Sequence, residues 1–307
     1  MSRRSLTCRI SQIEPIGCIG HVPAVGADTL HLHGQHGVRL FIGCVVTRKG
    51  SGRRVDDMIL KAPLAIKFAL GENPKSVYHD KDETPVTRMA TAGIIREELY
   101  KAKEYFLRKA RAEDDPEQDE PDFDIKMEAL QPLLWGKAEA HFHAHRADDI
   151  FTALRIAKEF GLRAVIIHGT EAHLVADLLA EEHVPVVSGP YMTDRSKPEI
   201  RNLSDAAPGL LCKAGIETAI TVDHPEIPLR LLPMALMLAV RAGMDKTDAL
   251  RAVTSVPAKI AGMQDRIGSL KTGLDADCVL WSGDPLDIAT QVQAVFVNGT
   301  PEYRRTK

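Results

Sequence analysis

The sequence predicts an α/β fold built on a parallel β-sheet, and two observations lead to this prediction. From residue 138 onward, short apolar segments alternate with amphipathic segments at the spacing of βαβ units. The short segments are nearly continuous in apolar residues, which is typical of strands that are buried on both faces. A chain of 307 residues, 44% of them hydrophobic, is long enough to bury a large core in one or two domains.

The same alternation places the elements in order along the chain. Each predicted helix carries apolar residues three and four positions apart, and Gly161 marks the end of one of them. The acidic run at 111–122 contains two prolines and few apolar residues, so we expect a solvated loop there. The predicted strands are 38–47, 62–72, 138–144, 163–168, 184–189 and 217–223, and the predicted helices are 87–110, 124–134, 147–160, 170–182 and 229–243.

The pattern changes after about residue 263. Short apolar segments are separated there by Gly, Asp and Pro residues that are typical of turns. These segments are 267–273, 276–281 and 291–299. We therefore expect residues 1–263 to form the main α/β domain and residues 264–307 to form a small β element beside it.

Composition and charge exclude several classes of function. The net charge of −3 gives no indication of a nucleic-acid or membrane partner, and the most apolar helical segment, 231–240, is too short to span a bilayer. Five cysteines without CxxC spacing argue against a disulfide framework and fit a reducing compartment. No long apolar run follows the basic N-terminus, as a secretory signal would require. We expect a cytoplasmic protein that acts on a small molecule.

The residues with catalytic potential lie at the ends of the predicted strands. In HFHAHRADDI (141–150), three histidines alternate along a strand and therefore point to one face. In an α/β barrel, the carboxyl ends of the strands gather around the active site. Reading those ends gives Glu72, His143 or His145, His168 and Asp223. Because zinc binds histidine nitrogen and carboxylate oxygen, the joint occurrence of these residues predicts a metal site.

Several motifs together carry a resemblance to a known family. They are LGENPK (70–75), HAHRADD (143–149), IIHGTEAH (166–173), SGPYMTDRSKPE (188–199), TVDHP (221–225) and DRIGSLKTGLDADCVLWSGDPLD (265–287). With them the sequence resembles the metal-dependent amidohydrolases, in the branch close to imidazolonepropionase. The resemblance covers roughly residues 53–300. It implies a (β/α)8 TIM-type barrel with a small β-sandwich element at the C-terminus.

The resemblance also implies roles for the residues at the strand ends. His143 or His145 would be the metal ligand of the fifth barrel strand, and His168 that of the sixth. Asp223 would bind or neighbour the metal and take a proton from its water as general base. Glu72 ends the strand that elsewhere in the family supplies a bridging carboxylate or lysine. The implied cofactor is one divalent metal, for which zinc is the first choice and iron and manganese are alternatives.

The implied substrate is a small molecule with a C–N bond other than a peptide bond, such as a cyclic amide. Three cationic side chains lie in or beside the strand-end loops, where they would hold an anionic group of that substrate. They are Arg146, Arg195 and Lys197.

The N-terminal part departs from the family pattern. The first barrel strand of these enzymes is apolar and carries a His-x-His pair. Here His31 and His33 have that spacing, but they lie with His36 in a glycine-rich segment that reads better as a loop. The first strands of the barrel are therefore missing or degenerate before about residue 53. Ile167 and Val222 stand where these proteins often have Glu and Thr, respectively.

Two functions of different classes remain open. The first is an amidohydrolase-type enzyme that uses a metal and Asp223. The second is a catalytically inactive, truncated relative that serves as an oligomerising scaffold. A barrel without its early strands exposes sheet edges, which a homo-oligomer would cover.

Overall fold

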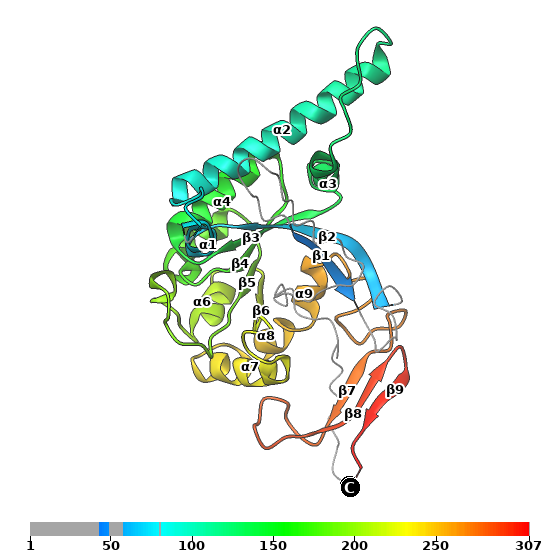
Figure 1. The fold of residues 1–307 in the computed structure, drawn as a ribbon. Coiled ribbons are helices and arrows are strands. Elements are labelled where there is room, and N and C mark those ends of the chain that lie inside the picture. The colour runs from blue at the N-terminus through cyan, green and yellow to red at the C-terminus, as the bar shows by residue number, and fades with distance from the viewer. Residues whose placement is uncertain (1–42, 49–57, 80, 307) are drawn as a thin grey trace.

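The computed structural model describes residues 43–48, 58–79 and 81–306, and of 43–48 it describes the backbone. A six-stranded sheet forms the centre of the molecule (Figure 1). Its order is β1 (Gly43–Arg48), β2 (Ile59–Ala69), β3 (Glu139–Ala144), β4 (Ala164–His168), β5 (Val186–Ser188) and β6 (Thr218–Ile220). Strands β2 to β6 are parallel, and β1 pairs with β2 in the antiparallel direction. The described residues thus form a curled half-barrel of five parallel strands, which confirms the predicted α/β class.

Helices connect the parallel strands or follow the last of them along the chain; several cover the outer face of the sheet, whereas the last helix packs on its inner face (Figure 1). They are α1 (Glu72–His79), α2 (Arg88–Asp114), α3 (Ile125–Leu134), α4 (Ala147–Phe160), α5 (Ala176–Glu181), α6 (Ala207–Lys213), α7 (Leu232–Arg241), α8 (Lys246–Arg251) and α9 (Ser255–Ile260). Helix α4 has the predicted bounds, and Gly161 ends it with the left-handed φ of 66° that glycine adopts without strain.

Alternation along the strands separates two cores. Phe68 and Phe142 point to the outer face, where their rings lie 5.1 Å apart against α2, α3 and α4. Ala65, Val165 and Ile167 point inward and pack with residues of α9. Because successive side chains in a strand point to opposite faces, the polar residues of the inner face share this second environment.

The inner face is the one that carries histidines. Lys67 of β2 lies in register with His141 of β3, and Ala69 lies in register with His143. His143 in turn lies in register with Ile167, which belongs to the inner core. Parallel strands in register therefore bring a lysine and two histidines of β2 and β3 to the same face.

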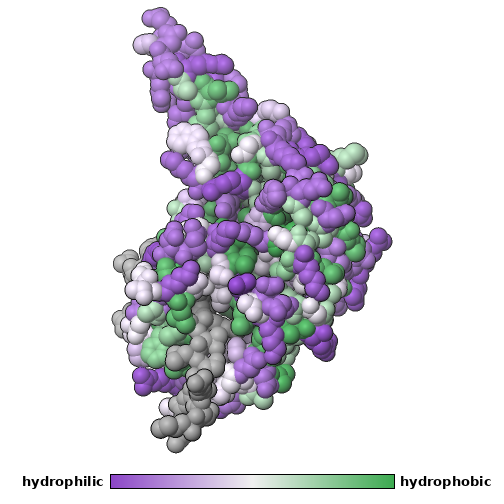
Figure 2. Space-filling model, turned by 180° about the vertical axis from the view of Figure 1, so that it is seen from behind, coloured by the Kyte–Doolittle hydropathy of each residue, from purple (hydrophilic) through white to green (hydrophobic). Residues whose placement is uncertain are grey.

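Three expectations about elements need correction, and one strand was not expected. Strand β2 ends at Ala69, so Glu72 does not end a strand but begins helix α1. Helix α2 continues through Asp114, so the loop is shorter than 111–122, and hydrophilic side chains dominate the projecting end of this helix (Figure 2). Segment 267–273 contains no strand. The short segment 300–304 forms a strand that the pattern did not predict.

A small antiparallel sheet follows the half-barrel. It consists of β7 (Cys278–Trp281), β8 (Val292–Val297) and β9 (Thr300–Arg304). This sheet confirms the small β element that the sequence predicts at the C-terminus. The domain boundary between residues 263 and 264 stays a prediction.

Candidate metal site

Three buried histidines meet at the carboxyl ends of β3 and β4. His143, His145 and His168 each offer a ring nitrogen, and these nitrogens all lie within 4.8 Å of one another. His143 belongs to β3, His145 follows that strand directly, and His168 is the last residue of β4. His168 has a φ of 74°, which takes the chain out of the strand, and its ring centroid lies 4.5 Å from that of His143.

The hydrogen bond of His168 leaves one of its nitrogens available for a metal. Its Nδ1 lies 2.8 Å from the carbonyl oxygen of Gly189. A carbonyl only accepts, so Nδ1–H donates and the lone pair is on Nε2. A backbone carbonyl that holds the second nitrogen in this way fixes the orientation of a ligating histidine.

A chain of polar contacts from α1 and a loop reaches His143. The Lys197 ammonium donates to Oδ1 of Asn73 over 2.5 Å, and this contact fixes the orientation of the Asn73 amide. The amide nitrogen of Asn73 then donates to Nε2 of His143 over 3.2 Å. Lys197, predicted to bind substrate, therefore lies beside the histidines. The sequence pattern did not identify Asn73 as a site residue, although it belongs to the LGENPK motif.

Both nitrogens of His145 face polar side chains. Nδ1 lies 2.8 Å from the hydroxyl oxygen of Thr170, and Nε2 lies 3.8 Å from Oε1 of Glu199. The imidazole ring stacks on that of His168, with centroids 4.8 Å apart and an angle of 14° between the planes.

Burial keeps the three histidines neutral. It lowers the pKa of His143 and of His145 well below the usual value, and the neighbouring histidines lower both further. It also lowers the pKa of His168, against the opposing charge of Asp223. Neutral imidazole is the form that ligates metals. A buried cluster of neutral nitrogens this close together therefore fits a divalent cation.

Lys67 is the inner-face residue of β2 that the sequence reasoning missed. Burial lowers the pKa of its ammonium group, and the charge of Asp223 opposes this shift. Lys67 also contributes to the lowered pKa values of His143 and His168, which places it in the same electrostatic environment. Once β2 is known to pair in register with β3, the strand period of two identifies this residue.

Glu72, predicted as a ligand at a strand end, makes different contacts. Its carboxylate lies 2.9 Å from the Arg88 guanidinium and 3.1 Å from the Lys75 ammonium. Partial burial raises the pKa of Glu72, but the contacts with Lys75 and Arg88 together outweigh this effect and lower it. The carboxylate therefore belongs to a network of ion pairs beside the histidines.

Asp223 lies just beyond β6. The residue has a left-handed φ of 51°, and its backbone N–H donates to the hydroxyl of Thr221 over 3.0 Å. The histidine cluster does not include it, although its charge acts on His168 and Lys67. Its assignment as ligand or base stays a prediction.

Two of the predicted substrate-binding cations are engaged in local contacts. Arg146 pairs with Asp148 over 2.9 Å at the start of α4. Arg195 donates to the carbonyl oxygens of Arg201 and Leu203, and so holds its own loop. Their roles in substrate binding stay predictions. His31, His33 and His36 lie outside the described residues.

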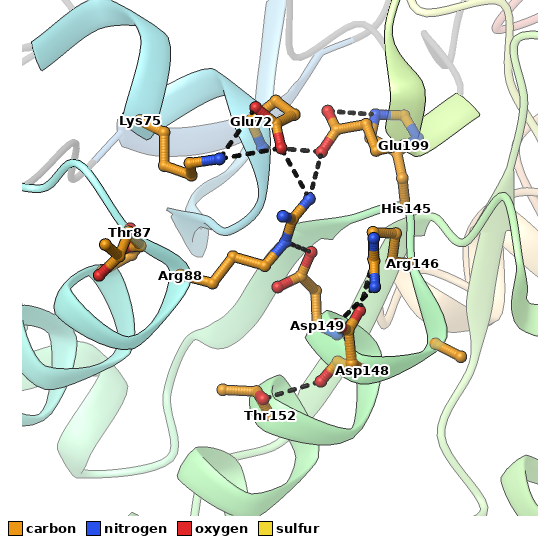
Figure 3. Close-up of polar contacts among 12 residues, drawn as sticks. Glu72, Lys75, Thr87, Arg88, His145, Arg146, Asp148, Asp149, Thr152 and Glu199 are labelled. Carbon is orange, nitrogen blue, oxygen red and sulfur yellow. Dashed lines mark hydrogen bonds and ion pairs between the residues drawn. The ribbon is translucent and has the colours of Figure 1, made fainter. Parts of the chain in front are cut away.

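A cluster of carboxylates, of which Asp149 and Glu199 are buried, surrounds Arg88 behind the histidines (Figure 3). The Arg88 guanidinium lies 2.9 Å from Asp149 and 3.7 Å from Glu199, in addition to its contact with Glu72. Burial raises the pKa of Asp149 and of Glu199, and Arg88 opposes both shifts. Arg88 thus joins the starts of α1, α2 and α4 to the loop after β5.

Comparison with known proteins agrees with this geometry. The model of the amidohydrolase family matches residues 134–303, which is more than half of the chain. The chain belongs to the amidohydrolase family. The match includes β3, β4 and all three histidines of the cluster.

Individual relatives are similar to this chain over different lengths. The crystal structure of an amidohydrolase from Thermotoga maritima MSB8 is 43% identical, with a TM-score of 0.83, and the alignment covers 86% of this chain and 69% of that chain. Amidohydrolase tasK of Hapsidospora irregularis is 28% identical over 78% of this chain and 25% of its own length. Imidazolonepropionase of Paracidovorax citrulli is 31% identical over 45% of this chain and 33% of its own length. The chain thus spans a quarter to a third of the length of these two relatives.

The described helices were compared with what a membrane span requires. Within residues 58–79 and 81–306, every helix is too short or too polar to cross a bilayer.

Because the histidines are buried, we expect the metal-free protein to lose stability in acid. Unfolded histidines have a pKa near 6.5, and the folded values are lower, so the unfolded state binds more protons as the pH falls through 6.5. We expect the free energy of unfolding to fall by up to about 1.4 kcal/mol in total between pH 7.5 and 5.5 for each such histidine. Urea unfolding with a chelator present measures this slope. His168→Asn should reduce it, and a slope that is unchanged in the variant contradicts the prediction.

Proposed function

We propose that this chain is a metal-dependent hydrolase that cleaves a C–N bond other than a peptide bond in a cyclic amide or a related small molecule. The observation that carries the proposal is the cluster of three buried, neutral histidines at the ends of adjacent parallel strands. Membership of the amidohydrolase family supports the same reaction class. We further propose a cytoplasmic location and one divalent metal, with zinc as first choice and iron or manganese as alternatives.

Histidines of this cluster would hold the metal. When bound there, a divalent cation polarises the substrate carbonyl and lowers the pKa of water toward neutrality. The Gly189 carbonyl orients His168 for this contact through Nδ1. In our proposal Asp223 takes the proton of the attacking water and passes it to the leaving nitrogen, as a general base and then a general acid.

Lys197 and Asn73 are well placed to hold an anionic group of the substrate. The Lys197 side chain is exposed, and it contacts Asn73, which in turn contacts His143. An anion that approaches the histidines therefore meets an ammonium group and an amide. Arg146 and Arg195 would take part only after giving up the local contacts described above.

A metal measurement tests the proposal. We expect about one equivalent of metal in the purified protein and its loss in His168→Ala, because the variant removes a ligand whose orientation the fold already fixes. His79→Ala is the control, since His79 is exposed at the end of α1. Asp223→Asn should keep the metal and lower the turnover of a cyclic amide by about 10²–10⁴-fold. A parent protein that takes up no zinc, iron or manganese contradicts the proposal.

A second candidate function is an inactive scaffold that forms homo-oligomers. The observation that favours it is the open sheet of the described residues, whose outermost strands are β1 and β6. Analytical ultracentrifugation together with the metal measurement separates the two candidates. A metal-free dimer without amide hydrolysis supports the scaffold, whereas a metal-loaded protein that turns over an amide supports the enzyme.

A further inference from the structure

Glu199 is a fully buried carboxylate that faces the histidine cluster. None of its surface is exposed, and its Oε1 receives no hydrogen bond from the described residues. The polar atom it faces is Nε2 of His145, 3.8 Å away (Figure 3). A buried carboxylate oxygen without a donor is costly, so this arrangement calls for a proton on the facing nitrogen.

The fold holds Glu199 in this position from behind. Oε2 accepts the backbone N–H of Glu72 over 2.7 Å, and the Arg88 guanidinium lies 3.7 Å away. Gly71 leaves room for the carboxylate, because a Cβ at that position would lie only 2.4 Å from Oε2. With Oε2 fixed, Oε1 is directed at His145. The remaining distance is longer than a hydrogen bond, and catalytic contacts in ligand-free enzymes commonly shorten when the site is filled.

We propose that Glu199 and Thr170 orient His145 as a positioning residue that does not ligate the metal. In this arrangement Nε2–H of His145 donates to Glu199, and Nδ1 accepts the hydroxyl hydrogen of Thr170. Neither nitrogen keeps a free lone pair. The oriented ring instead stacks on His168 and holds that ligand in place. The inference rests on the proposed function in naming His143 and His168 as the ligands.

His143 differs from His145 in the partner of its Nε2. That partner is the amide of Asn73, which is neutral and half-buried, and its other contact is with the exposed Lys197 side chain, so the amide and Lys197 can move together when a metal binds. The partner of Nε2 in His145 is a carboxylate that the fold fixes from behind. The two histidines on the same strand end thus have different roles, and this assigns the ligand that spacing alone left open.

Matched glutamine variants test the assignment through metal affinity. His145→Gln keeps an N–H donor toward Glu199 but loses the stacked ring, and we expect its zinc dissociation constant, measured against a chelator, to rise by no more than about tenfold. His143→Gln is the matched variant, for which we expect at least a 100-fold weaker affinity. A similar loss of affinity in His145→Gln makes His145 a ligand and overturns the inference.

Nitrogen-15 NMR of the histidine rings tests the same assignment without metal. The resonances of His145 are identified by their absence in His145→Gln. We expect the tautomer with the proton on Nε2, and we expect Glu199→Gln to shift these resonances. Glu159→Gln is the control, because it changes an arginine-paired carboxylate far along α4. A proton on Nδ1 of His145 overturns the inference, and so do His145 resonances that Glu199→Gln leaves unchanged. A parent that binds no metal but shows the expected tautomer overturns the proposed function alone.

Discussion

Replacing Arg88 by Met is expected to lower the free energy of unfolding by about 3–5 kcal/mol at pH 7. The guanidinium is the cationic partner of Asp149 and lies beside Glu199, and both carboxylates are buried. Without it, burial leaves two negative charges that must either stay unpaired or take up protons. Chemical unfolding of parent and variant, both with a chelator present, measures the difference.

The decrease in the free energy of unfolding of Arg88→Met should depend on pH. Burial already raises the pKa of Asp149 and Glu199, and removing Arg88 removes a contact that opposes this shift. The folded variant therefore binds protons more readily than the unfolded chain, and the stability difference from the parent shrinks as the pH falls. Arg96→Met is the control, because Arg96 pairs with Glu159 nearer the surface and should cost no more than about 1 kcal/mol. A loss equal to that control contradicts the prediction.

Replacing Gly189 by Ala is expected to lower the free energy of unfolding by about 3 kcal/mol or more and to weaken metal binding as well. Gly189 has a φ of 123°, and a Cβ there would lie 2.2 Å from the carbonyl oxygen of Thr221. Backbone strain and overpacking each cost about 1–3 kcal/mol. The same residue supplies the carbonyl that orients His168, so any backbone shift also moves a proposed metal ligand.

Gly215→Ala separates backbone strain from the steric contact. Gly215 also has a positive φ, of 82°, but a Cβ there would have open space around it. We expect it to cost about 1 kcal/mol and to leave the zinc affinity unchanged. Thermal unfolding and zinc titration of the two variants provide the comparison. Equal effects of the two substitutions on stability and on zinc affinity contradict the steric argument.

Periodic patterns predicted the elements that surround the histidines. Helix α4 begins and ends where its apolar spacing and Gly161 indicate, and the apolar run before His168 is strand β4. The apolar pattern places the end of β2 too late, at Glu72. The run ALGE continues the apolar pattern, but Gly71 has a left-handed φ of 82° that directs the chain into α1. Sequence alone does not show which glycine adopts such a conformation.

Part of the site was also predictable, because the periodic pattern locates the ends of the strands. The strand ends identified the three clustered histidines, because the carboxyl ends of parallel strands meet at one edge. Lys67 can be identified only from the register of β2 with β3, and the sequence of one strand does not determine its register with another. Glu199 is an ordinary charged loop residue in the sequence, and its burial depends on Arg88 and Gly71, which are distant along the chain.

All three clustered histidines come from one β3–α4–β4 unit, within residues 143–168. Closing a short loop costs little conformational entropy, and structures rich in local contacts fold quickly. The nitrogens of this unit can therefore approach one another before β5 and β6 have joined the sheet. A metal present during folding would then meet these histidines among the early contacts, whereas Asp223 follows β6 and is added to the fold only with the later strands.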